Sequence, residues 1–396
     1  MPGSPAPLGG ISLDQFMRRH WQRRPLLVRG AFPDFQSPVS PGDLFALAAR
    51  DDVESRLVTS FGGRWRLAHG PFERDELPSP RRRQWTLLVQ GVDTLVDPVR
   101  ELLDRFRFVA DARLDDLMVS YATDGGGVGP HLDSYDVFLI QAHGRRRWRV
   151  ARPGPTELVE GMPLKILSRF EPGHDWVLEP GDLLYLPPGW GHDGTALGEC
   201  MTFSVGFRAP SRHELLRAWL ADQAETPPTG PDPRYSDPGQ PATRHPGEVP
   251  SRMHATLTAW LRGWRPTRRA VDDFIGRFLT EPKASVWFER PSRRLSPAAL
   301  AQQAARRGLR ADRRTRMSWR DGRFFINGEC VEMPAPARPL LRRLADRRRL
   351  PPDVLARTPV DSPLFDSLHA WFDAGWIHLD EPSRPAARRP GSTRRP

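Results

Sequence analysis

The sequence predicts an α+β protein in which a β-barrel of the jelly-roll type precedes a helical region and a winged-helix-like C-terminal part. Short, apolar, β-branched segments separated by Gly or Pro fill residues 117–207, which is typical of barrels built from many short strands. After residue 210 the pattern changes to amphipathic helices. Two turn sequences near the C-terminus, Asp321-Gly322 and Asn327-Gly328, lie between helical segments and predict hairpins.

The composition indicates a folded protein of two or three domains. The chain has 396 residues, of which 38% are hydrophobic, with 13 Trp and 19 Phe available to fill a core. The net charge of +11 comes mostly from Arg; it fits partners that carry phosphate, such as a ribosome or DNA, and equally a solvated basic surface. The two cysteines, Cys200 and Cys330, cannot build a disulfide framework or a cysteine zinc site, which favours a reducing compartment.

The chain shows no targeting or membrane signal. Residues 1–10 lack a basic start followed by an apolar run, so we expect no signal peptide. No stretch approaches the roughly 18 apolar residues of a membrane span. We therefore expect a soluble, cytoplasmic protein with no membrane partner.

The N-terminal part is predicted to mix helices and strands. Ser12 and Gln15 form a capping box that predicts a helix through Phe16. Residues 23–30 indicate a loop entering a short strand. Helices are expected at 44–49 and at 98–106, where Pro98 suits a first helical turn. Strand-like segments lie at 56–59, 64–67 and 85–89.

The barrel is predicted to contain six further strands, with His143 at a turn tip between the second and third and His174 in a loop before the fourth. These strands are expected at 117–121, 137–141, 146–150, 175–178, 182–186 and 201–207.

The C-terminal half is predicted to be mainly helical. Residues 226–250 are rich in Pro, Gly and Asp and predict a linker, and residues 376–379 predict a final strand. Helices are expected at 214–224, 252–262, 268–279, 297–307, 338–346 and 363–374. This pattern divides the chain into a barrel domain (1–210), a helical region (211–280), a winged-helix-like domain (281–381) and a disordered basic tail (382–396).

A candidate metal site lies in the barrel region. His131 and Asp133, at positions i and i+2 of a strand, point to the same face and could share one ion. Iron(II) oxygenases use two His and one carboxylate and leave three positions for cosubstrate and O₂. A lone His-x-Asp is a weak signal, but His192 follows a buried strand and a stiff turn and can supply the third ligand. His143 and His174 compete for that role and are expected at the surface.

Residues 125–150, together with 186–192, resemble the JmjC family, and more specifically the bacterial ribosomal oxygenases that hydroxylate an arginine of large-subunit ribosomal protein sixteen. Segments 21–27, 204–210 and 274–280 extend the resemblance to nearly the whole chain. The resemblance implies a double-stranded β-helix barrel of the cupin type. It also implies iron(II) as the metal, with 2-oxoglutarate and O₂ as cosubstrates.

The far carboxylate of 2-oxoglutarate needs a buried cation, and the planar fork of arginine suits a carboxylate. Alternation along residues 145–150 places Arg146 on one face with Trp148 and Val150, and Arg145 and Arg147 on the other. The apolar side chains mark the inward face, so Arg146 is the predicted anchor, and the resemblance implies the same position. The alternative is that all these arginines are solvated.

Other residues are candidates for lining the pocket or touching the substrate. The resemblance implies that Ser120 hydrogen-bonds oxoglutarate or substrate. The remaining candidates share a strand face with Ser120, lie on the last barrel strand, or follow the predicted ligands: Met118, Thr202, Ser204, Tyr135 and Asp136. For Tyr135 and Asp136 the alternative is that they stabilise the turn after the ligand pair.

The resemblance implies hydroxylation of an arginine side chain of a ribosomal protein partner. A ribosomal-protein histidine hydroxylase, a cupin without oxygenase activity and a winged-helix regulator remain as alternatives. Arg146 disfavours the cupin without oxygenase activity, and the intact metal triad disfavours the winged-helix regulator. Because the chain is basic, a basic substrate requires local acidity, for which Asp115, Asp116 and Asp136 are the candidates.

The helical region is implied to form a homodimer, and Trp260 and Leu261 lie on one of its apolar faces. Winged-helix folds often bind DNA. In the resembling family this module is usually not a sequence reader, and its basic surface fits ribosomal material equally well. Direct nucleic-acid binding is therefore left open.

Overall fold

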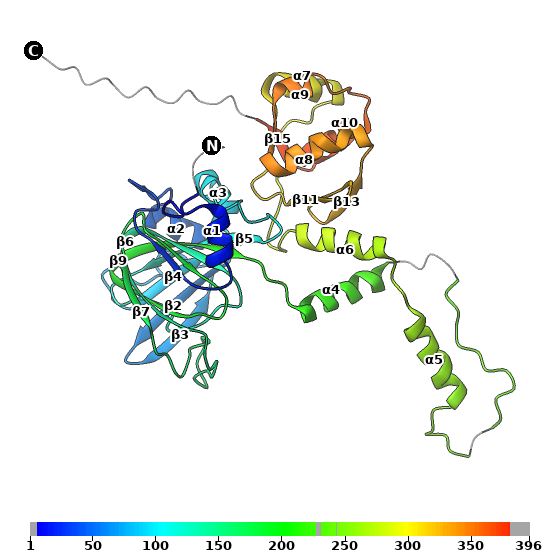
Figure 1. Ribbon diagram of the computed structural model, residues 1–396, viewed down its shortest axis with the longest axis horizontal. Coiled ribbons are helices and arrows are strands. Elements are labelled where there is room, and N and C mark those ends of the chain that lie inside the picture. Colours follow the sequence, from blue (N-terminus) through cyan, green and yellow to red (C-terminus); the bar gives the residue numbers. More distant parts are fainter. Residues whose placement is uncertain (1–5, 227–230, 243, 381–396) are drawn as a thin grey trace, which may run out of the picture.

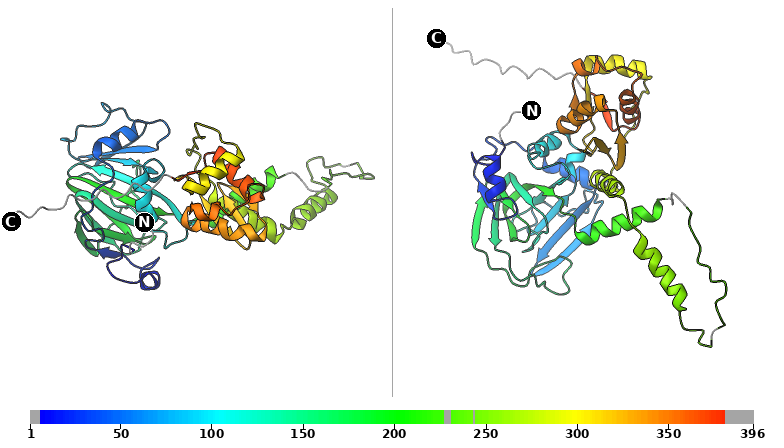
Figure 2. Two further views of the ribbon diagram at one scale, coloured as in Figure 1. Left: turned by 90° about the horizontal axis from the view of Figure 1, so that it is seen from above. Right: turned by 45° about the vertical axis from the view of Figure 1, so that its right-hand side comes forward.

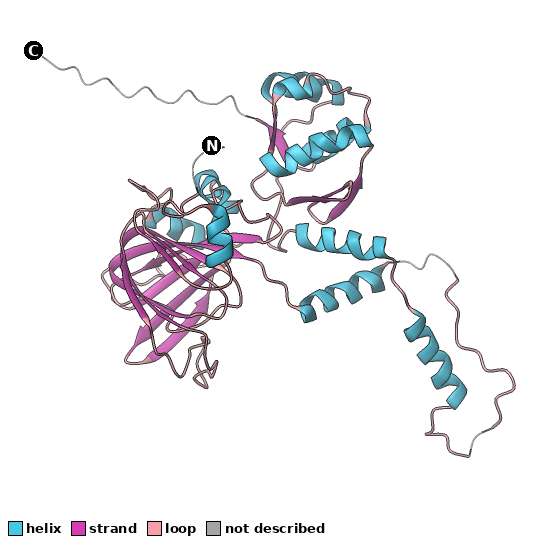
Figure 3. Ribbon diagram, in the orientation of Figure 1, coloured by secondary structure: helices cyan, strands magenta, loops and turns pink. Residues whose placement is uncertain are grey.

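The computed structural model describes residues 6–226, 231–242 and 244–380, so the predicted tail at 382–396 lies outside the described residues. A strand-rich barrel, a set of helices and a compact C-terminal module follow one another along the chain (Figure 1). The long strands lie in the barrel, whereas the C-terminal part combines helices with short strands (Figure 3). The predicted α+β class and its order of parts are confirmed.

Three helices cover one face of the barrel sheet. They are α1 (Leu13–Arg19), α2 (Pro41–Ala48) and α3 (Asp97–Asp104), with the short 3-10 helix η1 (Val92–Thr94) before α3. The predicted capping box at Ser12 and Gln15 is present, and Pro98 lies in the first turn of α3. Phe16, Leu44 and Val99 are fully buried beneath these helices in the largest apolar cluster.

The barrel strands form one antiparallel sheet in the order β1-β8-β6-β9-β5-β4-β2-β3, with β7 paired to β6 beside this path. The two longest strands, β6 and β9, pair with each other along most of their length at the centre of the sheet. Their bounds are β1 Leu26–Val28, β2 Ser55–Phe61, β3 Arg64–His69, β4 Trp85–Val89, β5 Leu114–Ala122, β6 Val137–Ala151, β7 His174–Leu178, β8 Leu183–Leu186 and β9 Gly191–Phe207.

Strand β6 is continuous, so the predicted turn at His143 is wrong. The register shifts on both sides of His143, which means that β-bulges absorb the extra residues without reversing the chain. Gly144 has φ +60°, and a Cβ there would lie 2.0 Å from the carbonyl oxygen of Glu199. The glycine thus marks a close approach of β6 and β9, which the sequence pattern does not distinguish from a turn.

Strand β9 starts at Gly191, ten residues before the predicted strand at 201, and therefore contains His192. Successive side chains of a strand point to opposite faces of the sheet, so each face of the barrel sheet has its own apolar cluster. Phe138 and Ile140 point to the helix-covered cluster, whereas Val137 and Leu139 belong to a second cluster with Trp148 on the opposite, inner face. The candidate site lies on this inner face.

After the barrel come α4 (Arg212–Glu225), α5 (Ser251–Gly263) and α6 (Arg268–Thr280). Helices α4 and α6 pack through Trp219 and Phe274, whose ring centroids are 5.0 Å apart. Helix α5 buries no residue and projects from the rest of the molecule (Figures 1 and 2).

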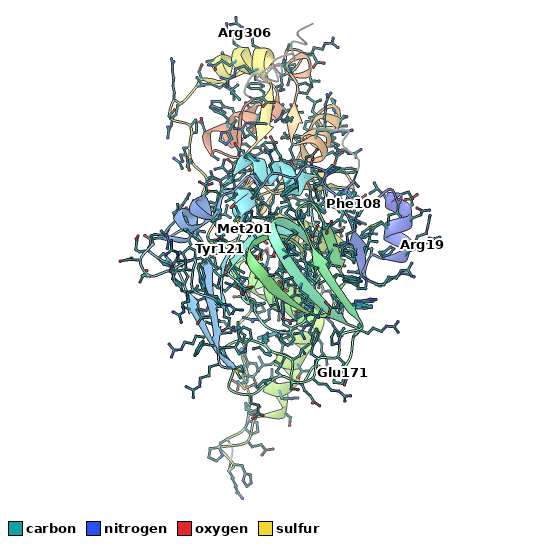
Figure 4. All side chains as sticks on the ribbon, turned by 90° about the vertical axis from the view of Figure 1, so that its left-hand side faces the viewer. Arg19, Phe108, Tyr121, Glu171, Met201 and Arg306 are labelled. Atoms are coloured by element: carbon teal, nitrogen blue, oxygen red, sulfur yellow. The ribbon has the colours of Figure 1, made fainter. Side chains whose placement is uncertain are left out.

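The C-terminal module has its own apolar core, which includes Leu300, Leu341 and Phe365. Arg306, on its first helix, lies at the top of the molecule in Figure 4, and the barrel residues Tyr121 and Met201 lie near its centre. Both predicted Gly turns are present in a three-stranded meander. The elements are α7 Pro297–Arg307, β10 Leu309–Ala311, β11 Met317–Arg320, β12 Arg323–Ile326, β13 Glu329–Glu332, η2 Ala335–Ala337, α8 Arg338–Arg347, β14 Arg349–Leu350, α9 Pro352–Leu355, α10 Pro363–Asp373 and β15 Ile377–Leu379.

An ion pair to α3 and a hydrogen bond to β5 join this module to the N-terminal part of the chain. Arg313 Nη1 lies 2.9 Å from Asp97 Oδ1, and Arg316 Nη2 donates to the carbonyl oxygen of Asp115 at 2.8 Å. Among the described residues, no helix is long and apolar enough to cross a membrane.

Candidate functional site

The fold brings His131, Asp133 and His192 together from two segments of the barrel. One ligand-capable atom of each lies within 4.8 Å of the others. His192 Nε2 is 3.6 Å from Asp133 Oδ2, and the two imidazole centroids are 4.2 Å apart. Two imidazoles and one carboxylate form the donor set of the facial triad, so these residues fit iron(II).

The backbone fixes the relative position of the three side chains. His131 N donates to the His192 carbonyl oxygen at 3.0 Å, and His192 N donates to the His131 carbonyl oxygen at 2.8 Å. Gly189 N donates to the Asp133 carbonyl oxygen at 2.8 Å, which ties the turn before β9 to the third side chain. The prediction that His131 and Asp133 lie on a strand is wrong, because His131 pairs with His192 through an isolated β-bridge and Asp133 lies in the following loop. This bridge and the turn bond preorganise the cluster.

Each histidine ring is held in the tautomer that a metal requires. His131 Nδ1 lies 2.9 Å from the carbonyl oxygen of Gly129, and His192 Nδ1 lies 3.0 Å from that of Trp190. A carbonyl can only accept, so Nδ1 carries the proton and the Nε2 lone pair is free. Burial, together with neighbouring His131, lowers the pKa of His192 to about 4, which keeps this ring neutral near pH 7.

The competing histidines lie elsewhere. His143 and His174 are exposed, as predicted, and neither belongs to the three-residue cluster. His174 is the first residue of β7 instead of a loop residue, and its ring stacks on Trp176 at 4.6 Å between centroids.

Arg146 is buried on the inner face of β6, with 4% of its surface exposed, whereas Arg145 and Arg147 are exposed. The predicted alternation is therefore confirmed. Arg146 Nη1 donates to Ser120 Oγ at 3.0 Å and to Thr202 Oγ1 at 3.2 Å. These neutral partners orient the guanidinium but leave its charge without a carboxylate among the described residues.

Two buried donors in this pocket lack a partner. Arg146 Nε and Trp148 Nε1 make no hydrogen bond to any of the described residues. Leaving a buried donor unsatisfied costs about 1–3 kcal/mol, so the pocket suits a ligand rich in acceptors. Gly194 makes room for both side chains, because a Cβ there would lie 2.7 Å from the Trp148 ring and 3.0 Å from Arg146 Nε.

Sequence reasoning missed Gln141 and Gly194, and used Trp148 only as a marker of the inward face. Thr202 Oγ1 donates to Gln141 Oε1 at 3.1 Å, while Gln141 Nε2 donates at 2.8 Å to the carbonyl oxygen of His143 in the bulge. The bulge thus holds Gln141, which orients Thr202 beside Arg146. Trp148 could have been found from its parity with Arg146, whereas no sequence signal marks Gln141.

Three further candidates lie around the mouth of the site. Met118 and Ser204 are directly opposite in the β5–β9 register and share the inner face with Ser120 and Thr202. Met118 Sδ lies 3.9 Å from Arg56 Nη2. Tyr135 is exposed and lines a cavity of about 390 Å³ together with Ser134, Phe278 and Lys283.

Of the two roles considered for Asp136, the structure supports the structural one and not a substrate contact. Asp136 is fully buried, and its carboxylate accepts from Tyr185 Oη at 2.6 Å, Gln22 Nε2 at 3.1 Å and Arg113 Nη2 at 3.1 Å. A buried carboxylate needs such partners, and they occupy it fully. Asp136 therefore anchors the N-terminal segment to the barrel.

Asp115 and Asp116 are also engaged. Lys283 Nζ lies 3.2 Å from Asp115 Oδ1 and 2.9 Å from Asp116 Oδ2. Gln90 Nε2 donates to Asp116 Oδ2 at 2.9 Å. The proposed acidic patch is thus largely used to hold the segment after α6.

Comparison with known proteins agrees with this architecture. The JmjC domain family matches residues 101–215, and the ROXA-like winged helix matches residues 258–378. Ribosomal protein uL16 3-hydroxylase of Escherichia coli is 36% identical over 92% of this chain and 97% of its own length. A probable ribosomal oxygenase of Haemophilus influenzae is 37% identical over 52% of each chain.

Solved structures extend the similarity to the whole fold. YcfD, a ribosomal oxygenase from Escherichia coli, superposes with a TM-score of 0.77 at 34% identity, covering 94% of this chain and 99% of that chain. Another structure of that protein contains cobalt and 2-oxoglutarate. With its barrel, its winged helix and this full-length similarity, the chain belongs to the ribosomal oxygenase family of JmjC-domain proteins.

Proposed function

We propose that this protein is an iron(II)- and 2-oxoglutarate-dependent hydroxylase that acts on an arginine side chain of ribosomal protein uL16. The observation that carries the proposal is the cluster of His131, Asp133 and His192 on the same inner barrel face as buried Arg146. The similarity to a uL16 3-hydroxylase over 97% of that protein supports the substrate.

His131, Asp133 and His192 would hold the iron through two imidazole nitrogens and one carboxylate oxygen. When bound, iron supplies the activation of O₂ that couples oxidative decarboxylation of 2-oxoglutarate, to succinate and CO₂, with hydroxylation of a substrate C–H bond. The protein contributes geometry, because the reciprocal hydrogen bonds between the two histidines restrict how the ligands can move.

Arg146 would bind the far carboxylate of 2-oxoglutarate. Ser120 and Thr202 orient its guanidinium through Nη1, Nη2 donates to the Gly194 carbonyl oxygen at 3.4 Å, and Nε has no hydrogen-bond partner among the described residues. The apolar side chains of Val137, Leu139 and Leu186 pack in the same inner layer and exclude water. In such surroundings a charge-assisted hydrogen bond is stronger than in water.

The substrate side chain would enter past Tyr135, whose side chain interacts with that of Asp133 and lines the 390 Å³ cavity. Met118 and Ser204 would line the same approach. Tyr135 is 40% exposed and Arg146 is 4% exposed, so a polypeptide would approach from the Tyr135 side.

We further propose a homodimer formed through residues 211–280. Leu261 on α5 is 81% exposed, and Leu257, Trp260 and Trp264 continue the same helix face. Leu216 and Leu220 on α4 are each 51% exposed. We assign catalysis to residues 1–210 and the winged-helix fold to 281–381, and place the protein in the cytoplasm, where ribosomal proteins are made.

Replacing His131 or Asp133 with Ala should abolish succinate formation and lower iron binding, because each change removes one of three ligands. The matched controls are His143→Ala and His174→Ala, which change exposed histidines of the same barrel. Metal content and succinate release measure the outcome. Unchanged succinate formation in His131→Ala protein would falsify the triad.

Arg146→Ala should weaken oxoglutarate binding by roughly 1.5–3 kcal/mol, the scale of a hydrogen bond to a charged group. Arg145→Ala serves as the control, since its exposed side chain lies on the other face of β6. Calorimetric titration of the metal-loaded protein measures both. If Arg146→Ala and wild-type protein bind oxoglutarate with equal affinity, Arg146 does not bind its far carboxylate.

Replacing both Trp260 and Leu261 with Glu should convert the dimer to monomer, because charges on the α5 apolar face oppose its burial. Ala259→Glu on the opposite side of the same helix is the control. Light scattering at micromolar concentration reports the mass. A monomeric wild-type protein would contradict the homodimer.

Incubation of the enzyme, iron(II) and oxoglutarate with an arginine-containing uL16 peptide should add the mass of one oxygen atom to the peptide. Tandem mass spectrometry should place the oxygen on the arginine side chain. If only a histidine-bearing ribosomal peptide gains oxygen, the arginine assignment fails and the oxygenase assignment stands.

A further inference from the structure

Helix α8 presents three arginines on its exposed half, beside strand β11 of the C-terminal module (Figure 1). Arg342, Arg343 and Arg347 are exposed, whereas the apolar side chains on the other half of the helix are buried. Arg343 and Arg347 are four residues apart, about 6 Å along the helix axis, and therefore point in the same direction. These three arginines are called the α8 basic face below.

The arginines of the α8 basic face have no acidic partner within the part of the chain that the structure describes. Neither Arg342 nor Arg343 nor Arg347 forms an ion pair with any described residue. Other arginines of the same module are neutralised: Arg323 Nη1, for example, lies 2.8 Å from Asp273 Oδ1. The charge of the α8 basic face is therefore available to an anionic partner.

Strand β11 adds an aromatic side chain to this face. The Arg342 guanidinium lies over the Trp319 ring, 4.5 Å from its centroid, and Trp319 is 41% exposed. Trp319 Nε1 donates to Asp346 Oδ1 at 3.0 Å, so the one acid of α8 bonds to an indole instead of an arginine. Single-stranded nucleic acids are bound by the same combination, in which arginines contact phosphates and an exposed aromatic ring lies beside them.

The surroundings of α8 favour contact with a sugar–phosphate backbone over insertion into a DNA groove. Arg107, just after α3, donates to the Ala345 carbonyl oxygen at 2.8 Å, so the N-terminal part of the chain covers the last turn of α8. A helix in the major groove lies between two walls of DNA, and this contact obstructs one of them. Helix α10 carries Asp366 and Asp373 and no Lys or Arg, so it is unsuited to approach phosphates.

We propose that the α8 basic face is a docking surface for the phosphate backbone of single-stranded RNA. The choice of RNA rests on the proposed function, because a ribosomal protein binds RNA in the ribosome. The surface itself rests on the unpaired arginines and Trp319. Because phosphates are the same in every sequence, we expect binding that does not depend on base sequence.

The first test is the double variant Arg343→Ala, Arg347→Ala in the full chain, titrated into a labelled single-stranded RNA and followed by fluorescence anisotropy. We expect the dissociation constant to rise about tenfold at about 0.1 M salt. The slope of log affinity against log salt should fall by about 1.4, since each phosphate contact on a single strand contributes about 0.7.

The matched control is the double variant Arg64→Ala, Arg66→Ala, which removes two exposed and unpaired arginines from β3 at the edge of the barrel sheet. Its dissociation constant should change less than about twofold. An equal loss of affinity in the two double variants would overturn the proposal, because total charge and not the α8 basic face would then bind RNA.

A third variant, Arg343→Lys with Arg347→Lys, separates loss of charge from loss of structure. Lysine binds phosphate as a point charge, so this variant should keep the salt slope of the wild type. Lysine protein that binds RNA as weakly as the alanine protein would contradict contact through phosphates. Poly-glutamate or duplex DNA that binds the wild type more tightly than single-stranded RNA would also reject RNA as the partner.

The outcomes separate this inference from the proposed function, because the α8 basic face lies outside the candidate metal site. His131→Ala protein should bind RNA like the wild type, and the Arg343, Arg347 alanine variant should form succinate at the wild-type rate. If the wild type binds RNA and forms no succinate, the oxygenase proposal fails and the docking surface stands. If it forms succinate and does not bind RNA, only the docking surface is rejected.

Discussion

The reciprocal backbone hydrogen bonds between His131 and His192 are the constraint on which the rest of the site depends. They place two imidazoles on one face of the barrel with 4.2 Å between ring centroids, and the turn bond from Gly189 to Asp133 adds the carboxylate. His131 joins β9 through an isolated β-bridge and Gly189 lies in the turn before β9, so these bonds hold the loop with His131 and Asp133 against the edge of the sheet. Strand β9 also pairs with β6, and this pairing fixes the position of Arg146 on β6 relative to His192 on β9.

The charged side chains inside and outside the barrel have different kinds of partner. Inside the barrel, Arg146 is buried among neutral hydroxyls, and in the proposed function the far carboxylate of 2-oxoglutarate supplies its counter-charge. Outside, carboxylates are used to join parts of the molecule: Asp136 holds the N-terminal segment, and Asp115 and Asp116 hold Lys283. The excess of positive charge, +11 over the chain, is therefore not balanced by an acidic surface made of these three residues.

Local patterns predicted much of this arrangement. Alternation in residues 145–150 was sufficient to find the buried face with Arg146, because a strand has only two faces. Gly144 misled, since a bulge and a turn both need a residue with positive φ, and only the pairing partner decides between them. Asp136 misled for a different reason: its partners Gln22, Arg113 and Tyr185 lie 114, 23 and 49 residues away, and tertiary contacts of this kind leave no periodic trace. Gln141 was missed likewise, because its role depends on the bulge that it stabilises.

The central claim is that this fold delivers an oxygen atom to a ribosomal protein, and intact mass spectrometry of ribosomal proteins from cells with and without the gene tests it most directly. The account predicts that uL16 from cells with the gene is heavier by the mass of one oxygen atom, located on an arginine, and that cells producing the His131→Ala protein lack this addition. Identical masses for every ribosomal protein in the two strains would contradict it.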